Sequence, residues 1–196
     1  MINNDVFDSI RARRSTRAFS GRAVEADKLD ALLEAAIWAP SGGNNQTWLF
    51  TAIQNGDVLA RLDELAREAF LRYVPDDDYP GKHGAKAMAE KSGDFHCFHR
   101  APTLIIASNR PGYENAMADC ALALENIFIA AESIGLGSCY INAFHWLRDD
   151  RPLREYMLAE LGIPREHTIC SAAAVGYIGK PSAVPERKPG TIRIIR

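Results

Sequence analysis

The chain has 196 residues and a mass of 21.6 kDa, which is the size of one domain with a substantial core. Its composition is 47% hydrophobic, 24% charged and 9% aromatic, which excludes disordered, collagen-like and disulfide-rich proteins. The formal net charge of −2 gives no overall field that would favour nucleic acid or an anionic membrane as a partner.

The first half of the chain begins without the basic start and apolar run of a signal peptide, so we expect a cytoplasmic protein. Its apolar spacing and turn residues predict, in order, a helix, a helix that Pro40 ends, a strand and a helix, over residues 5–13, 29–37, 47–53 and 57–73. Residues 74–94 are rich in Asp, Pro and Gly, and we expect a mobile connection of the kind that often forms a lid, with one helix late in it.

The second half predicts three strands and two helices, over residues 103–108, 116–134, 138–144, 152–161 and 168–178. The helix over 116–134 is apolar on nearly every face, so we expect it to be buried, with Gly135 just past its end. A Pro- and Lys-rich arm follows and ends in a strand-like segment, residues 191–195. Strands interleaved with helices without a regular βαβ order predict a single α+β domain with a mixed sheet.

Several familiar motifs fail on inspection. Gly135-Leu136-Gly137 lacks the third glycine of a dinucleotide-binding fingerprint and follows a helix instead of a strand. Gly176 to Pro181 does not have the spacing of a phosphate-binding P-loop. His96, Cys97 and His99 have no second Cys/His cluster to complete a zinc site, so we expect no metal. The four cysteines form no C-x-x-C pair, and we expect four buried thiols at positions 97, 120, 139 and 170.

Four segments remain that bring together cations, amides or small residues of the kind found in binding sites. They are Arg11 to Arg17, Ala39 to Trp48, Gly135 to Asn142, and Gly176 to Gly179 with Arg187 downstream. Guanidinium groups bind phosphate bidentately, whereas basic residues at a helix end also complement its dipole. The other three segments also have ordinary interpretations, as a turn, a tight connection into a strand and a solvated tail. Each segment alone leaves both interpretations open.

Together and in this order, the four segments resemble the nitroreductase family of FMN-dependent oxidoreductases. Its R-R-S-x-R-x-F motif corresponds to Arg13 to Phe19, and its A-P-S-x-x-N-x-Q-P-W motif corresponds to Ala39 to Trp48, with Thr47 in place of Pro. The resemblance extends from Arg13 to Arg187 and is weakest between residues 55 and 100. It implies a mainly antiparallel sheet flanked by helices.

The resemblance assigns different residues to each part of FMN. Arg13 and Ser15 are expected at phosphate or ribityl oxygens, with Arg14 assisting and Arg187 closing on the phosphate from the tail. Arg17 is expected at the N1/C2 edge of the ring, where a fixed positive charge stabilises the anionic reduced flavin; this is its catalytic role.

Further flavin contacts are implied from two other segments. From a second subunit, the resemblance implies contacts by the loop residues Pro40, Ser41, Gly42, Asn44 and Gln46. Tyr140 and Ile141 are expected to pack on one face of the ring, and the backbone N–H of Asn142 is expected to donate to N5. A backbone donor acts whatever the side chain, so the identity of residue 142 does not test this assignment.

The resemblance implies a two-step reaction. NAD(P)H gives hydride to FMN and leaves, and a nitroaromatic, a quinone or a similar small acceptor then takes its place. The family pattern also implies one FMN-binding domain over residues 1–196, with a lid at 74–94, in a homodimer that exchanges the arm at 180–196. The alternatives are a dehalogenase-type or peptide-azoline-oxidising member of the family, and a flavin storage or delivery protein without turnover.

Overall fold

The fold is built around a sheet whose strands are β1 (Leu49–Ile53), β2 (Thr103–Asn109), β3 (Gly137–Ile141) and β4 (Thr168–Gly176). The structure is a computed structural model that describes residues 3–91, 93 and 95–196. In this part of the chain the sheet has four strands in the order β1-β2-β4-β3, and every neighbouring pair is antiparallel. The expected α+β fold with a mainly antiparallel sheet is confirmed, and a parallel bridge joins Ser15 to Ser138 beside β3.

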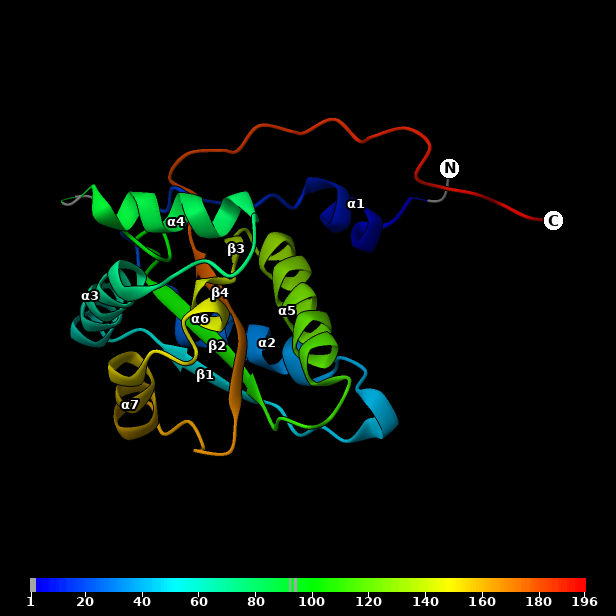
Figure 1. Ribbon diagram of the computed structural model, residues 1–196. Coiled ribbons are helices and arrows are strands. Elements are labelled where there is room, and N and C mark those ends of the chain that lie inside the picture. The colour runs from blue at the N-terminus through cyan, green and yellow to red at the C-terminus, as the bar shows by residue number, and fades with distance from the viewer. Residues whose placement is uncertain (1–2, 92, 94) are drawn as a thin grey trace.

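Helices cover both faces of the sheet (Figure 1). They are α1 (Asp5–Ala12), α2 (Ala26–Ile37), α3 (Gly56–Arg72), α4 (Pro80–Glu90), α5 (Ala116–Ser133), α6 (Ala143–Trp146) and α7 (Arg151–Glu160). Helices α2 and α5 share a core with Ile105 and Val175, whereas α3, α4, α6 and α7 share a second core with Leu104 and Ala174. Because successive side chains of a strand point to opposite faces, β2 and β4 contribute to both cores and are apolar along most of their length.

Two differences from the sequence-based element boundaries affect the site. The strand expected over 138–144 ends at Ile141, because the carbonyl oxygen of Asn142 accepts from the backbone N–H groups of His145 and Trp146 and starts α6. The expected lid segment contains α4, which begins early in it, at Pro80. Residues 92 and 94 of that segment lie outside the described residues.

Helix α5 is less enclosed than its sequence predicts. One face is buried through residues such as Leu124 and Ile127, and Gly135 ends the helix in the left-handed conformation as expected, with φ +77°. The opposite face leaves Leu122 47% exposed, beside exposed Met117. The expectation of burial on nearly every side is therefore wrong for the single chain, since nothing in its described part covers this face.

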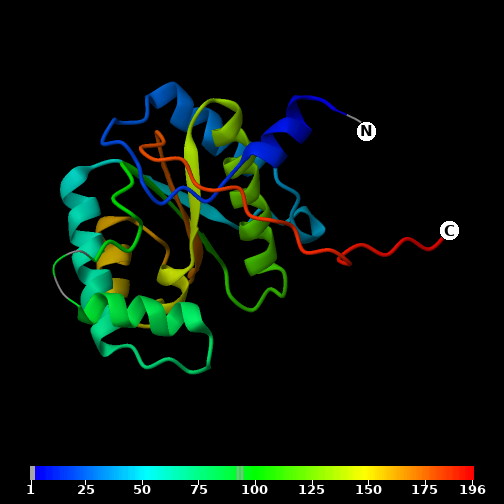
Figure 2. The ribbon, with the colours of Figure 1, turned by 90° about the horizontal axis from the view of Figure 1, so that it is seen from above.

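The C-terminal arm leaves the body of the molecule as an extended segment. It passes the segment that follows α1, where the Ser182 hydroxyl donates to the carbonyl oxygen of Ser15, and then projects into solvent (Figures 1 and 2). Every residue from 183 to 196 is exposed, including Ile192 and Ile194. The strand expected over 191–195 is absent from the described chain, because strand pairing needs a sheet edge that the arm does not reach within its own chain.

The start of the arm is anchored by a polar cluster around Tyr177. The Tyr177 hydroxyl donates to a Glu25 carboxylate oxygen at 2.7 Å and accepts from the Lys28 ammonium at 2.9 Å. The Arg22 guanidinium lies over the tyrosine ring, 4.0 Å from its centroid. The hydrogen bond from Tyr177, aided by the bond from Arg22, lowers the pKa of Glu25 to about 2.

This shift predicts an acid-dependent loss of stability. A carboxyl whose pKa is lower in the folded state stabilises the fold above its unfolded pKa of 4.5, and that contribution disappears as the pH falls from 4.5 towards 2. Tyr177→Phe should therefore lower the urea midpoint at pH 7 more than at pH 3. Tyr156→Phe, which alters a tyrosine packed against the other core, is the matched control. Equal losses at both pH values for Tyr177→Phe would contradict this account.

Candidate active site

A cavity of about 460 Å³ lies between α4, the segment that precedes β2, and the end of β3. Four predicted site residues line it together, namely Arg17, Tyr140, Ile141 and Asn142. Its remaining wall is largely apolar and aromatic, with contributions from Phe70, Tyr79, Ala85, Met88, Phe95 and Trp146. The cavity thus combines one permanent cation with surfaces that suit a flat, partly polar molecule.

Arg17 reaches the cavity because its segment lies along β3. The Thr16 backbone N–H donates to the carbonyl oxygen of Ser138 at 2.8 Å. A Cβ atom on Gly137 would lie 2.4 Å from the Thr16 hydroxyl oxygen, so only glycine permits this approach. The glycine pair at 135 and 137 therefore has the structural role of ending α5 and admitting the arginine segment.

Tyr140 is the exposed residue of an otherwise buried strand. Its side chain is 39% exposed, whereas the other residues of β3 are buried. The ring packs edge-on against Phe128 of α5, with the centroids 6.4 Å apart. This contact fixes the ring beside the cavity and presents an aromatic surface next to Ile141 and the start of α6.

The sequence analysis did not assign His96, Cys97 and His99 to this site, yet all three line the cavity. Asp63 of α3 holds their segment, because its carboxylate accepts from the Cys97 backbone N–H and lies 2.6 Å from the Nδ1 atom of His96. Among the described residues no cluster of His, Cys, Asp and Glu is arranged to hold a metal ion.

Burial controls the ionisation of these cavity groups. It raises the pKa of Asp63 and raises the pKa of the Cys97 thiol well above its usual value, so Cys97 is not a thiolate at neutral pH. Burial and the nearby charge of Arg17 both lower the pKa of His99, which keeps this imidazole neutral. The cavity therefore holds a fixed cation beside a neutral, titratable ring.

The loop of the second motif lies at the N-terminal end of α5, whereas Thr16, the neighbour of Arg17, is bonded to Ser138 beyond the C-terminal end of that helix. The Gly42 backbone N–H donates to the buried carboxylate of Asp119 at 3.1 Å, in the first turn of α5, and the Tyr113 hydroxyl donates to the Gly42 carbonyl oxygen at 2.8 Å. Asn44 and Gln46 both adopt positive φ, at 55° and 49°. Asp119, which the sequence analysis missed, thus anchors a strained loop that displays its amides to solvent.

The departure at Thr47 has a structural explanation. Its hydroxyl donates to the side-chain oxygen of Asn109 at 2.8 Å, and Asn109 is fully buried. Where the family motif has proline, this chain therefore fixes the backbone by a hydrogen bond into the core. The substitution leaves the rest of the motif in one anchored loop.

The remaining predicted residues stand apart from the cavity in the single chain. The Nε atom of Arg13 lies 3.6 Å from the Glu125 carboxylate, and Arg14 donates to the carbonyl oxygens of Arg11 and Arg13. Arg187 lies in the exposed arm. Arg13, Arg14, Ser15, Arg187 and the loop residues Pro40, Ser41, Gly42, Asn44 and Gln46 stay predictions as ligand contacts.

No helix in the described ranges is both long enough and apolar enough to cross a membrane.

Comparison with known proteins agrees with these features. The model of the nitroreductase family matches residues 10–177. A crystal structure of a nitroreductase with bound FMN from Bacteroides fragilis is 39% identical, with a TM-score of 0.88 over 99% of this chain and 100% of that one. A protein from Archaeoglobus fulgidus with the provisional name NADH dehydrogenase/NAD(P)H nitroreductase is 30% identical over 86% of this chain and 82% of its own. An FMN reductase [NAD(P)H] from Bacillus subtilis is 27% identical over 95% of this chain and 71% of its own.

Proposed function

The chain belongs to the nitroreductase family, and from that premise we propose that it is an FMN-dependent enzyme that moves hydride from NAD(P)H to a nitroaromatic, a quinone or a similar acceptor. The observation that carries this proposal is the cavity in which Arg17 meets Tyr140, Ile141 and Asn142. The similar structure from Bacteroides fragilis, at 39% identity, holds FMN.

The residues of the cavity fit the isoalloxazine end of FMN. An exposed tyrosine ring at the strand end suits stacking against a flat heterocycle, and the Arg17 guanidinium suits the ring edge that gains negative charge. The phosphate end needs further cations, which Arg13 and Arg187 of the exposed arm would supply as charge-assisted donors. In this assignment Asn142 would contribute its backbone N–H at N5.

The chain contributes binding, orientation and charge to the proposed reaction. FMN, when bound, accepts a hydride from the nicotinamide and returns it to the second substrate. Arg17 holds positive charge where the negative charge develops, and α4 borders the cavity through Gly84, Ala85 and Met88. Because α4 forms a wall at this place, we propose that residues 74–94 shape the entrance for the acceptor.

We also propose that the site is completed by a second copy of the chain. The loop with Gly42 lies near the other end of α5 from the cavity, so one chain cannot bring both motifs to one flavin. Exposed apolar side chains lie on α1, at the end of α2 and on α5, namely Phe7, Ile10, Ile37, Trp38 and Leu122. Burying these partly exposed side chains in an interface would remove apolar surface from water, which favours a homodimer.

Cofactor analysis and steady-state kinetics test the proposed function. Purified protein should release FMN on heating and should oxidise NADH or NADPH when a quinone or a nitroaromatic compound is added. Recovery of FAD, or no retention of either flavin after reconstitution, would reject the FMN site. Stable FMN binding without turnover across the acceptor panel would instead identify a flavin storage or delivery protein.

A further inference from the structure

His99 is a titratable group of the cavity for which the proposed reaction has no role so far. Its side chain is half-buried and lines the same cavity as Arg17 and Tyr140. The segment that carries it connects the region after α4 to β2. An imidazole at this place faces the volume in which we propose that the flavin ring and the substrates meet.

The backbone that presents His99 is strained. His99 and Arg100 adopt φ values of +60° and +55°, a conformation that non-glycine residues rarely adopt in succession. The turn is closed by the His99 N–H donating to the carbonyl oxygen of His96, and by the Ala101 N–H donating to that of Phe98. Such strain concentrates at functional sites.

The groups that face His99 determine when it binds a proton. The cavity lining includes one permanent cation, Arg17, and four other ionisable side chains, namely Tyr79, His96, Cys97 and Tyr140. Behind the segment, the carboxylate of Asp63 is held by His96 and by the Cys97 backbone. The positive charge of Arg17 disfavours a second positive charge on His99. The His99 imidazole therefore stays neutral until negative charge enters the cavity.

We propose that His99 is a proton carrier that binds one proton when the cofactor is reduced and gives that proton to the acceptor. The inference rests on the proposed function. Two-electron reduction would bring negative charge into the cavity that Arg17 and His99 line, and a nearby negative charge raises the pKa of an imidazole and favours its protonated form. The charge that enters the cavity with the hydride is thereby balanced by a proton.

The two half-reactions balance with a quinone as the acceptor. In the first, NAD(P)H gives one hydride to the bound cofactor and becomes NAD(P)+, and His99 takes one proton from solvent. In the second, the quinone gains that hydride and the proton of His99, forming two O–H bonds of a hydroquinone. The imidazole returns to its neutral form, and the sum consumes one NAD(P)H and one proton for each quinone.

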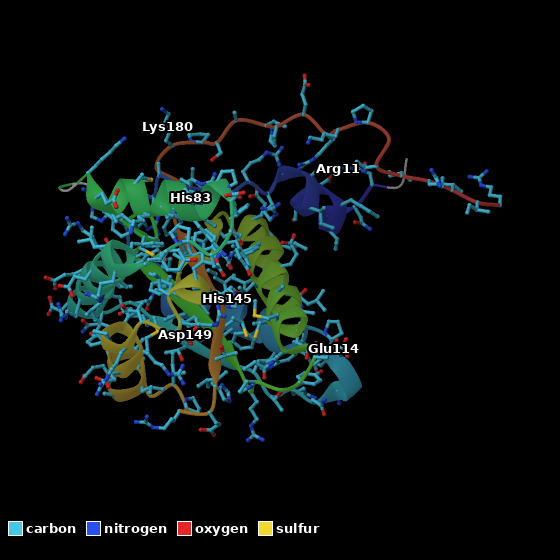
Figure 3. The ribbon with its side chains drawn as sticks, viewed as in Figure 1. Arg11, His83, Glu114, His145, Asp149 and Lys180 are labelled. Atoms are coloured by element: carbon cyan, nitrogen blue, oxygen red, sulfur yellow. The ribbon has the colours of Figure 1, made fainter. Side chains whose placement is uncertain are left out.

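The test counts protons instead of turnover. FMN-loaded protein in weak buffer with phenol red, reduced anaerobically by a stoichiometric amount of NADH at pH 7, should take up about one proton per FMN. His99→Asn should take up none, because Asn tolerates the left-handed turn but does not titrate. His83→Gln, altering an exposed imidazole of α4 (Figure 3), should behave like the wild-type protein, and His96→Gln, altering the other cavity imidazole, tells whether His96 takes the proton instead.

A potentiometric measurement checks the same step without NADH. Each proton taken up with two electrons makes the midpoint potential fall by about 30 mV per pH unit. The wild-type slope near pH 7 should therefore be about twice that of His99→Asn. Equal slopes in the two proteins would mean that a group other than His99 takes up the proton. Loss of proton uptake in His96→Gln but not in His99→Asn would assign that proton to His96. Either result overturns the proposal.

If His99→Asn fails to hold FMN, histidine 13Cε1 NMR of the His96→Gln and His83→Gln proteins decides the question. In each of these two proteins one histidine should become protonated when bound FMN is reduced at pH 7. If no histidine becomes protonated, the proposal is overturned. Failure to bind FMN in the wild-type protein would instead reject the proposed function, so the two failures are distinguishable.

Discussion

Mixing two inactive variants of this chain should restore about a quarter of the wild-type turnover, because random pairing makes half of the dimers mixed and each mixed dimer has one intact site of two. One variant is Arg13→Ala/Arg17→Ala, which removes the cations of the first motif. The other is Ser41→Ala/Asn44→Gly, which removes polar groups of the loop while glycine keeps the left-handed backbone at position 44.

The physical reason is the distance between the two motifs within one chain. Asp119 anchors the loop in the first turn of α5, whereas Thr16 is bonded to Ser138, beyond the end of that helix. An 18-residue helix is about 27 Å long, so we expect the loop to complete the cavity of a partner chain instead of its own. The variants are unfolded and refolded together, and differently tagged chains confirm that mixed dimers form.

Two results would contradict a shared site. Mixed dimers without restored activity would show that each site lies within one chain. An active monomer by light scattering would exclude the dimer requirement altogether. Circular dichroism of each variant before mixing is the control for folding, since inactivity must come from the site.

Arg17→Ala should slow reduction of bound FMN by NAD(P)H about 100-fold, which is the loss expected when one preorganised group at a developing negative charge is removed. The same variant should lower the flavin midpoint potential, because the reduced anion loses its neighbouring cation. Stopped-flow absorbance under anaerobic conditions measures the rate. Arg17→Lys retains the positive charge and should keep most of the rate.

Arg13→Ala and Arg187→Ala should have a different signature. Each removes a charge-assisted contact to the phosphate end, which is worth about 1.5–3 kcal/mol, so FMN affinity should fall by roughly 10- to 100-fold while the reduction rate of bound FMN stays close to wild type. Fluorescence titration of apoprotein with FMN measures the affinity. Identical phenotypes for Arg13→Ala and Arg17→Ala would remove the basis for separate roles.

The order and type of most elements follow from the sequence because their causes are local. The stripe of Leu29, Leu32 and Leu33 predicts α2, and the apolar runs predict strands at the places of β2 and β4. Gly135 ends α5 as its position predicts. The motif from Arg13 to Phe19 also identifies the family, which the family match confirms.

Tertiary structure alone decided which groups share a cavity. Phe95 and His99 lie far along the chain from Arg17 and Tyr140, and only the packing of α4 and of the turn before β2 brings them together. Asp119 reads as an ordinary helix residue in sequence, yet its burial makes it the anchor of the Gly42 loop. Likewise, α6 replaces the end of an expected strand because the Asn142 carbonyl finds helical donors.

Helix α5 and the C-terminal arm both show that the sequence predicts apolar segments but not the surfaces that cover them. The sequence shows that residues 116–134 are mostly apolar and that residues 191–194 alternate polar side chains with Ile. Periodicity states which residues need cover, but it does not say which surface covers them. Leu122 and Ile194 stay exposed in the single chain, because no other part of the described chain packs over them.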